Sequence, residues 1–67
     1  MTIEKLYVIQ GKSKEGELLY WNNKTGYSSF IIAEIFTNRT EFVLPLGGKW
    51  QRLSDAIIEY SNYLEEI

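Results

Sequence analysis

Aromatic and arginine side chains are the groups in this chain whose types and spacing best suit binding chemistry. Trp21 and Tyr27 flank an asparagine-rich turn, Arg39 lies in a second predicted turn, and Trp50 precedes Arg52 by two residues on a predicted strand. Aromatic rings beside guanidinium groups are the usual anchors of protein interfaces, and they also stack on nucleobases. The pattern therefore predicts contact residues for a partner or a ligand. The alternative is that both tryptophans belong to the core.

The composition of the chain offers few side chains that could act in catalysis. The chain has no histidine and no cysteine, which removes the commonest general base, the thiolate nucleophile and the usual ligands of zinc and iron–sulfur sites. Glu15 and Glu17, or Glu34 and Glu41, could form a carboxylate pair, but no spacing singles out either pair and solvated surface carboxylates are the simpler interpretation. We expect neither enzymatic activity nor a metal or other cofactor.

Three short segments have the composition of β-strands. Residues 5–10 and 17–22 are rich in β-branched and aromatic residues, and the polar, glycine-bracketed segment 11–16 between them predicts a hairpin. Residues 22–26 form the next turn, and Gly47–Gly48 another. Residues 49–53 predict a last short strand. In the first two strands apolar residues fall on both faces, so both faces of the sheet need to be covered.

The segment 30–37 is ambiguous. Its β-propensity permits a buried strand that turns at Asn38–Arg39 and returns through residues 40–44. Alternatively, Ser28 or Ser29 caps one short helical turn that ends at Ala33, and only residues 35–37 are extended. Seven residues are too few for periodicity to decide between these structures.

The C-terminus has the pattern of an amphipathic helix, Ser54–Ile67. Ser54 is a natural N-cap, and Asp55 suits the positive end of the helix dipole. One stripe of the helix is apolar: Ala56, Ile57, Tyr60, Tyr63, Leu64 and Ile67. The opposite side carries Asp55, Glu59, Asn62 and Glu66, with Ile58 as an apolar exception.

The expected fold is therefore a single α+β domain spanning residues 1–67: a small antiparallel sheet of three to four short strands with one C-terminal helix. One helix covers only one face of the sheet. Either the segment 30–46 folds over the second face or another chain does. Since the chain has 67 residues and no disulfide, we expect self-association, most simply a homodimer, to add stability.

Charge and hydropathy limit the kinds of partner. Seven basic and nine acidic residues give a net charge of −2, and residues 53–67 carry four acids and no base. Because the seven bases are scattered, nucleic-acid binding is disfavoured. No apolar run approaches the roughly 20 residues that a membrane-spanning helix needs. The N-terminus lacks the features of a signal peptide, so we expect a cytoplasmic protein without a membrane partner.

The order of several short motifs resembles small uncharacterised proteins of bacteria and their phages. The motifs are Tyr7-Val8-Ile9, Leu19-Tyr20-Trp21-Asn22, Gly26-Tyr27, Ala33-x-Ile35-Phe36-Thr37 and Leu44-Pro45-x-Gly47-Gly48-x-Trp50. Tyr27 stands where a tryptophan is expected, and residues 38–40 replace a more usual acidic helix start. The resemblance implies a β-rich sheet with a helix, no catalytic residues, and a phage or prophage setting in which short acidic proteins often inhibit host defence systems.

These observations lead to three hypotheses. The first is a non-enzymatic protein that binds and blocks a larger host protein, with Ile58, Glu59 and Glu66 on its acidic helix attracted to a basic surface. The second is a small-ligand binder or nucleotide sponge, with Trp21, Tyr27, Arg39 and Trp50 lining a site at a dimer seam. The third is a structural or assembly module that acts by strand addition, for which the apolar segment 30–36 is the candidate.

Overall fold

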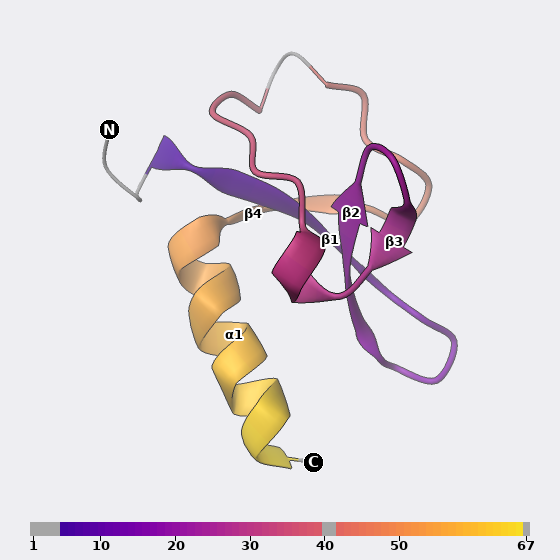
Figure 1. Ribbon diagram of the computed structural model, residues 1–67, viewed down its shortest axis with the longest axis vertical. Helices are drawn as coiled ribbons and strands as arrows, with labels where there is room; N and C mark the ends of the chain where they lie inside the picture. The colour runs from indigo at the N-terminus through magenta and orange to yellow at the C-terminus, as the bar shows by residue number, and fades with distance from the viewer. Residues whose placement is uncertain (1–4, 40–41, 67) are drawn as a thin grey trace.

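The fold is a four-stranded antiparallel sheet with one helix across one face (Figure 1). The computed structural model describes residues 5–39 and 42–66. The elements are β1 (Tyr7–Lys12), β2 (Leu18–Asn22), β3 (Gly26–Ser28), the 3-10 helix η2 (Phe30–Ile32), β4 (Lys49–Arg52) and α1 (Leu53–Glu66). The strand order is β3-β2-β1-β4. The predicted α+β class, with a small antiparallel sheet and one C-terminal helix, is confirmed.

Hydrogen bonds of the loops set the register of the first three strands. In the β1–β2 loop, the Ser13 carbonyl and hydroxyl accept from the backbone N–H groups of Gly16 and Glu17, each at 3.0 Å. This loop places Gln10 opposite Tyr20. In the β2–β3 turn, Asn22 Oδ1 accepts from the N–H of Lys24 at 2.8 Å, which closes an Asx turn and leads the chain back antiparallel to β2.

The main core lies between the sheet and α1. Val8, Leu18 and Tyr20 face the helix, where they meet Leu53 and Ala56. The ring of Phe30, from η2, packs against this cluster with its centroid 5.0 Å from that of Tyr20. The alternation predicted for the first two strands is therefore confirmed on this face. The segment 30–37 takes the second of its two predicted forms, a short helical turn.

The structure of residues 29–36 explains why this segment is not a strand. Ser29 is the N-cap residue of η2, although its side chain makes no capping hydrogen bond. After η2, the backbone N–H of Glu34 donates to the Trp21 carbonyl at 2.8 Å, and Phe36 exchanges two 2.8 Å backbone hydrogen bonds with Tyr7. The chain thus continues the sheet beside β1 beyond the end of β2. The predicted return strand is absent from residues 42–44, and residues 40–41 lie outside the described part.

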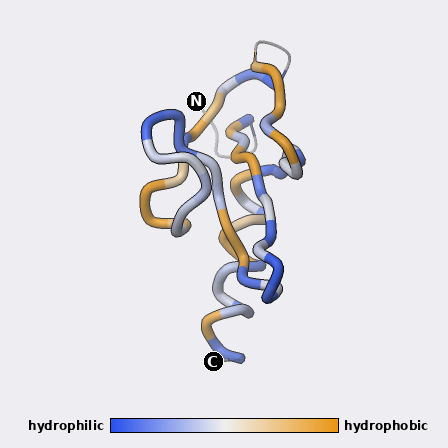
Figure 2. The backbone as a smooth tube through the Cα atoms, turned by 90° about the vertical axis from the view of Figure 1, so that its right-hand side faces the viewer, coloured by the Kyte–Doolittle hydropathy of each residue, from blue (hydrophilic) through white to orange (hydrophobic). Residues whose placement is uncertain are grey.

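The second face of the sheet is covered by the chain itself. The Tyr27 ring lies so close to Gly11 that a Cβ there would be 2.7 Å from Tyr27 Cε1. The turn from Pro45 to Gly48, closed by a 2.9 Å hydrogen bond between these two residues, packs on Ile9, whose side chain is fully buried. Of the predicted cover, segment 30–46, only the end at Pro45 and Leu46 lies on this face, whereas its start at Phe30 packs on the helix side. The chain that follows residues 40–41 is strongly hydrophobic (orange in Figure 2).

The helix begins one residue earlier than predicted. Strand β4 runs directly into α1, and the N–H of Leu53 donates to the Leu6 carbonyl at 2.9 Å. The sheet therefore satisfies the first N–H group of the helix, and Ser54 lies inside the first turn instead of capping it. Residue 67, the predicted end, lies outside the described residues.

The apolar stripe of α1 is also rotated from the predicted one. Leu53 and Ala56 are buried and Tyr60 and Tyr63 pack on the core, whereas Ile57 is exposed on one flank. On the other flank Glu59 is half-buried, which contradicts its predicted place on the solvent side. The buried stripe therefore includes Leu53, which the sequence pattern assigned to a strand.

We predict that Gly48→Ala destabilises the fold by steric overlap alone. The added Cβ would lie 2.7 Å from both Ile9 Cγ2 and Tyr27 Oη, and overpacking of this kind costs about 1–3 kcal/mol. Urea denaturation measures the loss, with Ser61→Ala on the exposed helix surface as a near-neutral control. Equal stability of the two variants would contradict the packing of this turn on the sheet.

Candidate functional site

The eight residues predicted to contact a partner do not form one site. Two of them, Trp21 and Tyr27, pair across β2 and β3, whereas Arg39, Trp50 and Arg52 line a hollow beside β4. The acidic pair Glu59 and Glu66 lines another hollow, on the helix side of the sheet, and Ile58 is 62% exposed on the outer surface of α1. The predicted nucleotide site built from Trp21, Tyr27, Arg39 and Trp50 together is thus divided between two places.

Trp21 and Tyr27 are part of the packing of the second face. Their rings meet edge to face with centroids 5.2 Å apart. Trp21 Nε1 donates to Asn23 Oδ1 at 2.8 Å, and the Tyr27 hydroxyl donates to the Leu46 carbonyl at 3.1 Å. Partial burial raises the pKa of the Tyr27 phenol. Both rings are half-buried, so they hold the turn at Leu46 in place and expose only part of their surface.

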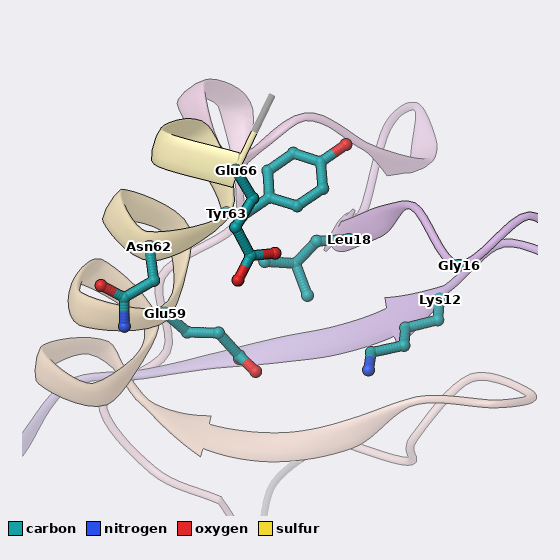
Figure 3. Close-up of a pocket in the computed structure, with 7 residues that line it drawn as sticks. All are labelled: Lys12, Gly16, Leu18, Glu59, Asn62, Tyr63 and Glu66. Atoms are coloured by element: carbon teal, nitrogen blue, oxygen red, sulfur yellow. The ribbon is translucent and has the colours of Figure 1, made fainter.

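A hollow between the β1–β2 hairpin and the C-terminal half of α1 combines charges of both signs. Lys12 from β1 and Glu59 from α1 extend into it from opposite sides, and the Glu66 carboxylate lies nearby (Figure 3). Leu18 and Tyr63 supply its apolar surface, and its volume is about 230 Å³. Such a mixture suits a polar ligand in principle, but Glu59 also has bonding partners within the fold.

Glu59 belongs to a polar cluster under the helix. Gln51 Nε2 donates to Glu59 Oε1 at 2.8 Å, and the nearly fully buried Gln10 donates from its Nε2 to the same oxygen and to Gln51 Oε1. The fully buried Tyr20 hydroxyl, next to this cluster, has no hydrogen-bond partner among the described residues. The carboxylate therefore anchors α1 to β1 and β4. Sequence periodicity missed this role because a glutamate at that helical position is normally solvated.

A second hollow, of about 360 Å³, is almost wholly apolar and lies between η2 and the N-terminal half of α1. Its floor is formed by Val8, Phe30, Ala33 and Leu53. Its rim consists of Ile31, Ile35 and Ile57, which are 84%, 52% and 40% exposed. We call these seven residues the isoleucine surface. The sequence signal for it is the apolar run at residues 30–36, for which the sequence pattern suggested binding by strand addition.

Two other features are absent from the described part of the chain, namely a cluster of metal ligands and a membrane-spanning helix. Within residues 5–39 and 42–66, no group of three or more His, Cys, Asp or Glu side chains could hold a metal ion. No described helix has the length and apolar character needed to cross a membrane. Comparison with protein-family models, curated proteins and solved structures finds no match. The isoleucine surface is the candidate functional site.

We predict that Glu59→Ala destabilises the protein by about 1–3 kcal/mol. The substitution leaves Gln51 Nε2 without its acceptor and removes one of the two acceptors of Gln10, and buried donors without partners carry a penalty of this size. Glu66→Ala removes the same charge from an exposed position and should change stability by less than about 0.5 kcal/mol. Equal effects in urea denaturation would contradict the anchoring role of Glu59.

The Tyr20 hydroxyl gives a prediction about pH. Burial raises the pKa of this phenol above its ordinary value of 10.0; Glu59 and Tyr60 add to the shift, and the nearby Gln10 amide opposes it. The unfolded chain therefore ionises first, so the part of the stability linked to this proton is present below pH 10 and is lost as the pH rises above it. We expect Tyr20→Phe to reduce this alkaline loss.

At neutral pH the same variant should keep its stability or gain up to about 1 kcal/mol, because the hydroxyl has no hydrogen-bond partner in residues 5–39 and 42–66. Tyr27→Phe is the matched comparison. It removes a 3.1 Å hydrogen bond to the Leu46 carbonyl and should cost about 0.5–1.5 kcal/mol. Thermal denaturation at neutral and alkaline pH measures both variants. A loss above about 1 kcal/mol for Tyr20→Phe at neutral pH would contradict the prediction.

Proposed function

We propose that this protein is a non-enzymatic binding module whose isoleucine surface docks on a larger protein. The observation that supports the proposal is the high exposure of Ile31, Ile35 and Ile57 around an apolar hollow. Isolated apolar residues on a surface are ordinary, but a cluster around a concave apolar floor is typical of interaction sites. While these isoleucines are exposed to water, they contribute no buried apolar area to the stability of this small domain.

The net charge of the helix that borders this surface indicates the kind of partner. Helix α1 forms one wall of the hollow through Leu53 and Ile57, and residues 53–67 carry four carboxylates and no base. A partner segment with one or two large apolar side chains flanked by lysine or arginine would fill the hollow and meet complementary charge. Complementary charge accelerates association and selects among partners.

The acidic helix also argues against a second copy of the chain as the occupant. A symmetric pair that met through this surface would bring two such helices close to each other, and with them like charges that no base of the helices offsets. The proposal therefore favours a different, basic protein over the homodimer. The resemblance to small bacterial and phage proteins supports an inhibitory role, in which the module occupies a surface that a host protein needs.

The test is partner capture by a tagged protein from host lysate, compared between two matched variants. Ile31→Ser removes an 84% exposed side chain from the rim of the hollow, and Leu46→Ser removes a 98% exposed one from a distant loop. Burying an isoleucine contributes about 1.5–3 kcal/mol. We therefore expect Ile31→Ser to weaken binding of the captured protein at least tenfold and Leu46→Ser to leave it unchanged.

The variants should match the wild type in thermal denaturation, because both side chains are solvent-exposed. Equal weakening by Leu46→Ser would mean that the partner binds elsewhere. Native mass spectrometry of the purified protein adds a second criterion. If the protein forms a dimer that Ile31→Ser dissociates, the isoleucine surface binds a second copy of the chain and not the proposed basic partner.

A further inference from the structure

Three distant parts of the chain meet in a hollow at the outer edge of β4. Tyr7 comes from the start of β1, Arg39 from the connection before β4, and Trp50 and Arg52 from β4 itself. Gln51 and Asp55 complete the lining, and the volume is about 220 Å³. We call this site the arginine hollow. None of its residues belongs to the isoleucine surface, so its function is independent of the function proposed above.

Two arginines line this hollow, and one of them lies over the Tyr7 ring. Arg52 is the cross-strand partner of Tyr7, so both side chains project from the same face of the sheet. Arg39 reaches the same ring from the connection, with its Cζ 5.0 Å from the ring centroid. A guanidinium that lies on an aromatic ring keeps N–H donors available at its edge. The tyrosine ring thus positions Arg39 beside Arg52.

The positive charge of the hollow is not neutralised within the described structure. Neither arginine forms an ion pair with a described carboxylate, and Asp55 is the one carboxylate that lines the hollow. Among the described residues that line the hollow, two guanidinium groups against one carboxylate leave an excess positive charge. Paired arginines present planar forks of donors, which match the geometry of phosphate oxygens better than lysines do.

A flat apolar surface lies next to these donors. Trp50 meets Tyr7 edge to face with centroids 6.5 Å apart, and it meets Phe36 in the same way at 5.3 Å. These contacts fix the orientation of the indole, and the part that is not covered lines the hollow. An indole held in this manner can stack on a planar ring without a further loss of side-chain freedom.

From this juxtaposition we propose that the arginine hollow binds a nucleoside monophosphate, with its phosphate on Arg39 and Arg52 and its base on Trp50. A single nucleotide fits the charge distribution better than a nucleic-acid strand does. Lys12 and Lys14 lie in the β1–β2 hairpin and Lys24 in the β2–β3 turn. Lys5, just before β1, and Lys49, at the start of β4, are the two lysines nearest in sequence to the residues of the hollow, which is too few for a basic path along a strand.

The experiment is a fluorescence titration of the full chain carrying Trp21→Phe, so that Trp50 is the one remaining tryptophan of the two. The probes are adenosine monophosphate, adenosine and inorganic phosphate. We expect saturable quenching of Trp50 by the monophosphate. Binding of adenosine and of inorganic phosphate should each be at least tenfold weaker, because each probe lacks one of the two contacts.

Three charge variants make the test specific. Arg39→Gln and Arg52→Gln should each weaken binding of the monophosphate at least fivefold, and Lys24→Gln, which removes the same charge from an exposed turn, should change it less than twofold. All three positions are exposed, and circular dichroism confirms that each variant is folded. Because the isoleucine surface is separate, Ile31→Ser should bind the nucleotide as the wild type does.

Four results would overturn the proposal. No saturable change with the monophosphate would show that the hollow does not bind it. If inorganic phosphate binds as tightly as the monophosphate, the base does not contribute to binding. If adenosine binds as tightly as the monophosphate, the phosphate does not contribute. An effect of Lys24→Gln as large as that of Arg39→Gln would show general charge attraction instead of a site. None of these results bears on partner binding at the isoleucine surface.

Discussion

Two adjacent residues of the central strand, Val8 and Ile9, are both fully buried. Successive side chains of a strand point to opposite faces, so this pair requires a cover on each side of the sheet. A chain of 67 residues with one long helix can cover one face with that helix and has only connecting segments for the other. The arrangement of η2, the long connection before β4 and the helix follows from this requirement.

Different parts of the connection between β3 and β4 cover the two faces of the sheet. Phe30 packs under the helix with Tyr20 and Tyr60, whereas the Pro45–Gly48 turn packs on Ile9 from the opposite side. The connection crosses from one face to the other along the edge of β1, where Phe36 bonds to Tyr7. Not all of its apolar residues are buried in the two cores. Ile31 and Ile35 remain on the surface and form part of the site that we propose for partner binding.

The polar residues under the helix show a second constraint. Gln10 occupies a buried position on a strand whose neighbours are apolar, and its amide therefore needs partners from elements that pack on it. Gln51 and Glu59 supply them, which ties β4 and α1 to β1. The acidic character of the outer helix surface consequently depends on the other carboxylates, and a role for Glu59 in attracting a partner would compete with its bonds inside the fold.

Local sequence patterns were sufficient to predict much of the fold. Alternation of apolar residues predicted the faces of β1 and β2, and the 3.6-residue period predicted the C-terminal helix, because both patterns reflect burial of one element against its nearest neighbours. Composition also predicted which residue types could bind. The form of residues 30–37 was beyond this reasoning, since strand and helical turn have similar local propensities there and hydrogen bonds from Glu34 and Phe36 to distant strands favour one of them.

Tertiary structure alone decided which candidate residues share a site. The eight predicted contact residues fall into separate groups because the strand order places β1 between β2 and β4 and so keeps Trp21 away from Trp50. Arg39 and Arg52 line one hollow with Tyr7 because of the register of β4 and the path of the connection. Ile31 and Ile57, 26 positions apart, border one hollow because the helix returns across the sheet. The sequence by itself determined the binding chemistry of the side chains, and long-range pairing, which no local pattern encodes, determined where that chemistry is combined.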